Sequence, residues 1–121
     1  MPKKKTSQVS GADSWRVIAM GYPETEATPS CNKTAFKARK KSFLFLGEEV
    51  DSYNVMVKLG DSRPEAEALA AESPEKVSVG PHWITAEFTE DELLPSEMVQ
   101  RWGDESFRLV APKTLIKKLD S

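Results

Sequence analysis

Residues 34–59, TAFKARKKSFLFLGEEVDSYNVMVKL, decide the fold. Aromatic and β-branched residues form three short apolar runs in this stretch, at positions 34–38, 42–46 and 53–59. The two connections between the runs are charged and only a few residues long. Parallel strands would need a crossover of about a dozen residues or more. The stretch therefore predicts three strands paired as an antiparallel meander.

Helical patterns lie on both sides of the meander. Apolar residues at helical spacing predict a short amphipathic helix over residues 12–20. A second helix is expected from about Ser62 or Arg63, with Pro64 in its first turn, to about Ser73. A third begins near Pro95 and carries an apolar stripe to about residue 110, with Gly103 weakening its middle.

The remaining segments complete an α+β pattern. Residues 76–79 and 83–88 are strand candidates, and residues 21–32, with two prolines, predict a long loop. Residues 113–119 form a short basic segment at the end of the chain. We expect one α+β domain over residues 11–121, an antiparallel sheet with helices on one face, behind a flexible basic tail of residues 1–10.

Composition excludes several classes of protein. A chain of 121 residues has room for one domain. No apolar run approaches the roughly 18–20 residues of a membrane helix, and no secretory signal follows the first lysines, so we expect a cytoplasmic protein. One cysteine and one histidine exclude a disulfide framework and a multi-cysteine zinc site. We expect no catalytic residue, no cofactor and no metal.

Although the net charge is −2, the charged residues are distributed unevenly along the sequence. Residues 1–41 hold nine basic and three acidic side chains, whereas residues 42–105 hold four basic and fifteen acidic ones. Residues 106–121 are basic again, with four basic side chains and one acidic. If the two basic ends meet in space, a polyanion could bind there while the acidic middle faces away. The sequence leaves that arrangement open.

The turn between the first two predicted strands is the leading candidate site. Its cations are Lys37, Arg39, Lys40 and Lys41, with Lys33 just upstream. A turn with four cations suits phosphate contacts, and a two-stranded ribbon can enter a DNA groove. The alternative is an ordinary solvated turn. A pI of about 5.5 weighs against strong duplex binding.

The pair His82-Trp83 is the second candidate. Trp83 could offer an aromatic platform to a base or another ligand, but the favoured interpretation is an inward-facing core residue beside Ile84 and Phe88. A lone histidine is weak evidence for catalysis. We expect Cys31 to be a structural loop residue, and we interpret the acidic groups at 48–51 and 90–92 as solvated loops rather than a cation site.

Several segments resemble one known family. They are residues 29–47 (PSCNKTAFKARKKSFLFLG), then YNVMVKL, PEAEALAAESPE, HWITAEF and ESFRLV, which together span about residues 14–112. These resemble the hairpin, strands and closing helix of the MmcQ/YjbR family. The resemblance implies a frataxin-like (CyaY-like) α+β fold and a DNA-binding role that is itself a prediction for the family.

The pattern and the resemblance lead to one working hypothesis. We expect a non-enzymatic binding protein whose partner is DNA, contacted through its phosphates by the basic turn. The alternative is a module that binds another protein or a small molecule on the sheet face near Trp83.

Overall fold

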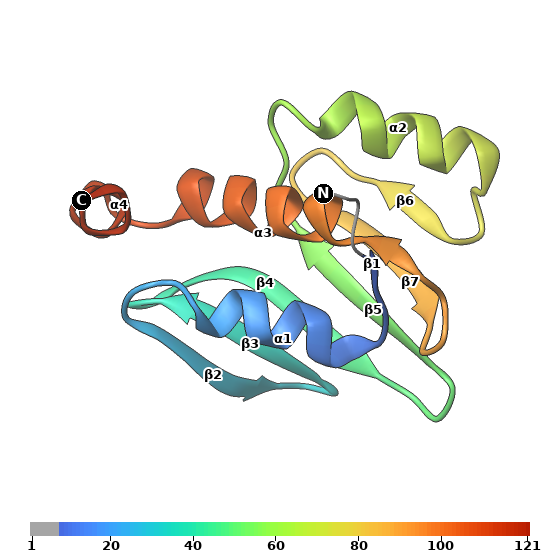
Figure 1. The fold of residues 1–121 in the computed structure, drawn as a ribbon, viewed down its shortest axis with the longest axis horizontal. Helices are drawn as coiled ribbons and strands as arrows, with labels where there is room; N and C mark the ends of the chain where they lie inside the picture. The colour runs from blue at the N-terminus through green and yellow to red at the C-terminus, as the bar shows by residue number, and fades with distance from the viewer. Residues whose placement is uncertain (1–7) are drawn as a thin grey trace, which may run out of the picture.

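Six antiparallel strands form the central sheet of the computed structural model, which describes residues 8–121 (Figure 1). Across the sheet the order is β2-β3-β4-β5-β7-β6. The strands are β2 (Thr25–Ser30), β3 (Lys33–Ala38), β4 (Lys41–Glu48), β5 (Ser52–Val57), β6 (Val77–Val79) and β7 (Ile84–Thr89). A separate two-stranded ribbon pairs β1 (Gln8–Val9) with β8 (Leu94–Pro95). The predicted meander is confirmed as β3, β4 and β5.

The helices gather on one face of this sheet, as the α+β prediction requires. They are α1 (Ala12–Met20), α2 (Arg63–Glu72), α3 (Ser96–Val110) and α4 (Lys113–Asp120). In Figure 1, α1 and α3 lie across the sheet and α2 lies beside β6. None of the helices in residues 8–121 is long and apolar enough to cross a membrane.

Large aromatic residues fill the space between α1, α3 and the sheet. Trp15 of α1 and Trp102 of α3 are fully buried, with ring centroids 6.4 Å apart. The Trp15 indole N–H donates to the Tyr53 hydroxyl of β5 at 3.2 Å, so its one polar group is satisfied inside the core. Gly103 of α3 lets the two helices approach closely, because a Cβ there would lie 3.0 Å from Ile18 Cγ2.

A β-bulge adapts β4 to the core. The β3–β4 register shifts between Phe36 and Lys37, so Phe43 has no direct partner. A bulge places two consecutive side chains on nearly the same side of a strand. Phe43 and Leu44 are accordingly both fully buried, and the Phe43 ring meets Phe107 of α3 edge to face at 5.2 Å.

The structure corrects the sequence-based assignment at residues 21–32 and at the end of the predicted tail, and it adds a helix near the C-terminus. Residues 21–32 were expected to form a loop but contain the edge strand β2. The basic segment 113–119 forms helix α4. Gln8 and Val9, which fall in the predicted tail, form β1, whereas Lys3, Lys4 and Lys5 lie outside the described residues.

Candidate functional site

The turn between β3 and β4 meets the C-terminal helix α4. Arg39 occupies the turn with a φ of 60°, and its guanidinium donates to Thr114 Oγ1 of α4 at 3.3 Å. The same guanidinium donates to Glu24 Oε1 at 3.1 Å, and Lys118 Nζ lies 3.6 Å from Glu24 Oε2. Glu24 therefore bridges the turn and α4. The two basic segments that the sequence separates by some seventy residues are in contact.

Packing and a second ion pair hold α4 in this position. Leu115 is fully buried in the core cluster. Arg108 at the end of α3 donates to Asp120 Oδ1 at 2.6 Å and to Asp104 Oδ2 at 2.8 Å. Hydrogen bonds from Arg108 hold the pKa of the Asp120 carboxyl below its ordinary value. The helix is thus joined to α3 through its last turn and to the β3–β4 turn through its first.

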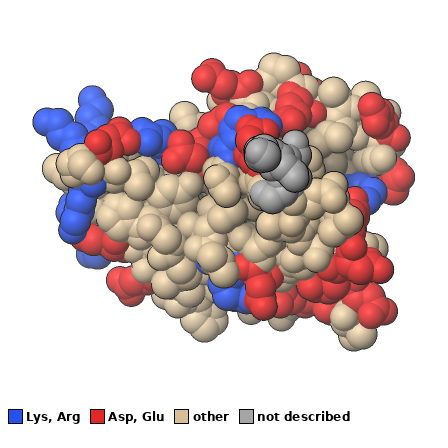
Figure 2. Space-filling view, in the orientation of Figure 1, with Lys and Arg blue, Asp and Glu red and all other residues tan. Residues whose placement is uncertain are grey.

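Together these segments make a cationic surface that we call the basic end. Lys and Arg gather at the end of the molecule where α4 lies (Figure 2). Its exposed members are Arg39, Lys40, Lys41, Lys113, Lys117 and Lys118. Carboxylates within it are Glu24 and Asp120, both paired with arginine. The hydrogen bond from Arg39 lowers the pKa of Glu24, so this bridge keeps its charge across the neutral range.

The opposite end of the strands is acidic. The β4–β5 turn and the loop after β7 meet there, where the Glu90 N–H donates to the Asp51 carbonyl at 3.0 Å. Figure 2 shows the Asp and Glu side chains spread over this side. Within residues 8–121, no three His, Cys, Asp or Glu side chains come together in a group that could hold a metal ion. The exposed cations of the basic end and the carboxylates of these two loops therefore lie at opposite ends of the strands.

The five cations that were predicted to form one site lie in separate parts of the structure. Arg39, Lys40 and Lys41 lie at the basic end, and Lys37 lies on β3 opposite Glu26 and Ser42 in the ladder. Lys33 begins β3, about 16–20 Å from the turn at the rise of a β-strand. Its ammonium donates to Asn54 Oδ1 at 2.5 Å. Lys33 therefore belongs to the other half of the sheet.

The sheet face away from α1 and α3, which we call the open sheet face, holds the second candidate. Trp83 precedes Ile84, and because successive strand residues alternate, the buried Ile84 leaves Trp83 on this face. Trp83 is only partly buried and lies outside the core cluster, so its interpretation as an inward-facing core residue is wrong. Its ring meets Phe45 at 5.2 Å, and Lys58 Nζ lies 5.1 Å from its centroid.

The other single residues that the sequence singled out lie in turns. His82 is exposed in the four-residue connection between β6 and β7, which is closed by a hydrogen bond from the Gly80 N–H to the Trp83 carbonyl at 2.9 Å. Cys31 is an exposed free thiol in the turn between β2 and β3, with a φ of 57°. Neither residue is one of the cations of the basic end, and Cys31 lies at the opposite end of β3 from the β3–β4 turn.

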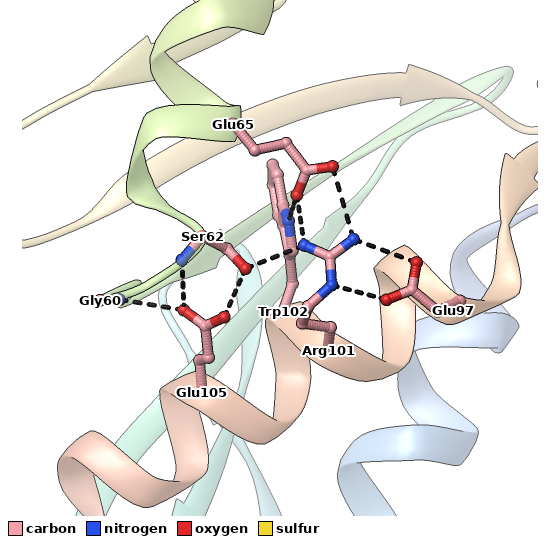
Figure 3. A network of polar contacts seen from close by, with 7 residues as sticks. All are labelled: Gly60, Ser62, Glu65, Glu97, Arg101, Trp102 and Glu105. Carbon is pink, nitrogen blue, oxygen red and sulfur yellow. Dashed lines mark hydrogen bonds and ion pairs between the residues drawn. The ribbon is translucent and has the colours of Figure 1, made fainter.

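Sequence reasoning missed a polar network that joins α2 to α3 (Figure 3). Arg101 of α3 donates to Glu65 Oε1 at 2.5 Å and to Glu97 Oε2 at 2.6 Å. Glu105 accepts from the backbone N–H groups of Gly60 and Ser62 at 3.0 and 2.9 Å, at the start of α2. This network satisfies backbone N–H groups of the connection that leads into α2 and holds α2 against α3, so its role is structural.

Fold and surface define a small antiparallel α+β protein with one basic and one acidic end. The YjbR family model matches residues 20–109, so the chain belongs to the YjbR family. This confirms the MmcQ/YjbR resemblance. Searches of curated proteins and of solved structures each gave no match.

Proposed function

We propose that this protein is a non-enzymatic, cytoplasmic nucleic-acid-binding protein that contacts DNA phosphates through the basic end. The proposal rests on one observation, the contact between the β3–β4 turn and α4 through Arg39, Thr114 and Glu24. It joins two basic segments into one continuous cationic surface. Lys33 is not included, since its ammonium bonds Asn54 toward the other end of β3.

The net charge of −2 does not oppose this mode of binding. Many of the carboxylates lie at the far end of the strands and others lie on α2 and α3, and exposed charges separated by more than about 10 Å are largely screened at 0.1 M salt. Phosphates at the basic end therefore meet mainly lysine. Contacts of this kind carry no sequence information and release counterions, so affinity should fall steeply with salt.

Two variants of equal net charge test the proposal. The first is Lys40→Gln, Lys41→Gln and Lys113→Gln, all exposed at the basic end. The matched control adds three carboxylates elsewhere, as Val50→Glu, Ala68→Glu and Ala71→Glu, also at exposed positions. Each set lowers the net charge by three, so they differ only in where the charge changes.

Fluorescence anisotropy with labelled duplex and single-stranded DNA at two salt concentrations provides the measurement. We expect the glutamine variant to bind more weakly to every DNA sequence, with a slope of log affinity against log salt reduced by about 2–3. The control should keep nearly the native affinity and slope. An equal loss in both variants would show that net charge alone is sensed, and that result contradicts a binding site at the basic end.

A second candidate function is favoured by the position of Trp83. A half-buried tryptophan outside the core, on a face free of α1 and α3, could bind a small molecule or another protein. Trp15 and Trp102 are fully buried, so a ligand-induced change in fluorescence that disappears in Trp83→Phe would report binding at this face. Such a change without any effect of DNA would favour this function over the first.

A further inference from the structure

We propose that the open sheet face beside the basic end takes a single strand of DNA, with bases stacked on Trp83 and Phe45 and phosphates held by Lys58 and Lys37. This inference rests on the proposed function and names the form of nucleic acid and the path that it follows. The basic end and the open sheet face near Trp83 then form one binding site.

The strand directions place Trp83 at the basic end of the sheet. In an antiparallel sheet, β4 begins, β5 ends and β7 begins at the edge where the β3–β4 turn lies. Val57 pairs with Ile84, so Lys58 and Trp83 are the next residues toward that edge. From β3 to β7 there are three strand spacings, or roughly 14–15 Å. The distance from Trp83 to the basic turn is therefore no longer than a few nucleotides of a DNA strand.

Aromatic and apolar side chains cover the middle of this path. The Phe45 and Trp83 rings lie 5.2 Å apart at an angle of 65°, and both side chains are half-buried. Phe45 pairs across the ladders with Ala35 on one side and Met56 on the other. Stacking on exposed aromatic rings is how proteins bind single strands without sequence preference, because every base has a flat π-face.

Lysines flank the rings on the same face. Lys58 Nζ lies over the Trp83 ring, 5.1 Å from its centroid, and its flexible side chain can turn from the ring to the phosphate of a nucleotide that stacks there. Lys37 shares this face, next to the basic turn. Carboxylates on the same face stand away from the rings, with Glu26 on the edge strand β2 and Glu87 opposite Asn54 toward the acidic end. The cationic side of the face is thus the side that holds the rings.

A single strand fits these groups better than a duplex does. In a duplex the base faces are already stacked on one another, so rings on a sheet reach only unpaired bases. We commit to DNA, because the proposed function concerns DNA, and treat RNA as a competing probe.

The test compares a labelled oligo-dT strand, a labelled duplex and an oligo-rU strand with the full chain. Trp83→Leu removes the ring while keeping an apolar side chain, and Trp83→Phe restores an aromatic face. We expect Trp83→Leu to weaken binding of oligo-dT about tenfold, with duplex affinity and the salt slope unchanged. Trp83→Phe should recover most of the lost affinity. Oligo-dT should quench native fluorescence, and the quenching should vanish in Trp83→Phe.

The outcomes separate this inference from the proposed function. If Trp83→Leu keeps native affinity for oligo-dT while the glutamine variant of the basic end loses it, the stacking site is wrong and the basic end stands. If no DNA binds at low salt, both proposals fail. If oligo-rU binds tenfold more tightly than oligo-dT, the commitment to DNA is overturned. Circular dichroism of both Trp83 variants should match the native chain, since Trp83 lies outside the core.

Discussion

Ser106 is a small residue on which two strands depend. It is fully buried in α3, where its hydroxyl donates to the Phe43 carbonyl at the β4 bulge. The same oxygen accepts the backbone N–H of Lys58 at 2.9 Å, just after β5. One hydroxyl therefore satisfies two backbone groups that the bulge and the strand end leave without ladder partners.

Ser106→Ala should lower the free energy of unfolding by about 1–3 kcal/mol, because it leaves a buried donor and a buried acceptor unpaired. Urea denaturation of the purified chain measures the change. Ser78→Ala, an exposed position on β6, is the matched control and should change stability little. A loss no greater than in the control would mean that water replaces the hydroxyl.

Trp83 shows what a residue pattern could and could not predict. The alternation in WITAEF divides the strand correctly into two faces. The alternation does not show which face of the sheet the helices cover. We expected Trp83 to be buried because tryptophan is large. The signal was in its neighbours, because Thr85 and Glu87 share the face of Trp83 whereas Ile84, Ala86 and Phe88 form the apolar set.

At the scale of elements, the sequence predicted the strands with strong apolar patterns and missed the weak ones. β2 reads TEATPS, with a proline and a glutamate, and such a strand is stable only as the edge of an existing sheet. α4 reads KTLIKKLD, and its eight residues are too few for a stable isolated helix. Both form because of tertiary contacts, β2 with β3 and α4 through Leu115, which local sequence does not contain.

The pairing of α2 with α3 should make stability depend on pH. Hydrogen bonds from Arg101, and then from the Trp102 indole N–H, hold the pKa of Glu65 below its ordinary value of 4.5, although partial burial opposes them. A carboxyl whose pKa is lower in the folded chain contributes stability above its unfolded pKa. That contribution is lost as pH falls through the folded value.

We therefore expect the free energy of unfolding to fall as pH drops below about 4.5. Glu65→Gln should be less stable than the native chain at pH 7 and should lose less on acidification. Denaturant titrations at pH 7 and at pH values below 4.5 provide the measurement. Glu72→Gln removes an exposed charge from the same helix and serves as the control. If both variants show the same pH dependence, the Arg101 network does not stabilise the docking of α2.

At the scale of the whole molecule, the sequence revealed blocks of charge but not their positions in space. The basic blocks meet because α3 returns the chain to the β3–β4 turn, where Glu24 bridges Arg39 and Lys118. The acidic groups meet because the β4–β5 turn lies beside the loop after β7. The path of α3 and the order of strands in the sheet together determine these neighbours. The charge distribution along the molecule is thus a property of topology.

This separation predicts chromatographic behaviour that net charge alone does not explain. A chain of net charge −2 should still bind heparin at low salt, because the polyanion meets the basic end alone. The variant with Lys40, Lys41 and Lys113 changed to Gln should elute from heparin at clearly lower salt. The charge-matched control carrying Val50→Glu, Ala68→Glu and Ala71→Glu should elute near the native position. On an anion exchanger the control should instead be retained longest, since its added carboxylates include Val50→Glu in the acidic β4–β5 turn. If both variants moved together on both columns, the two ends would not act as separate surfaces.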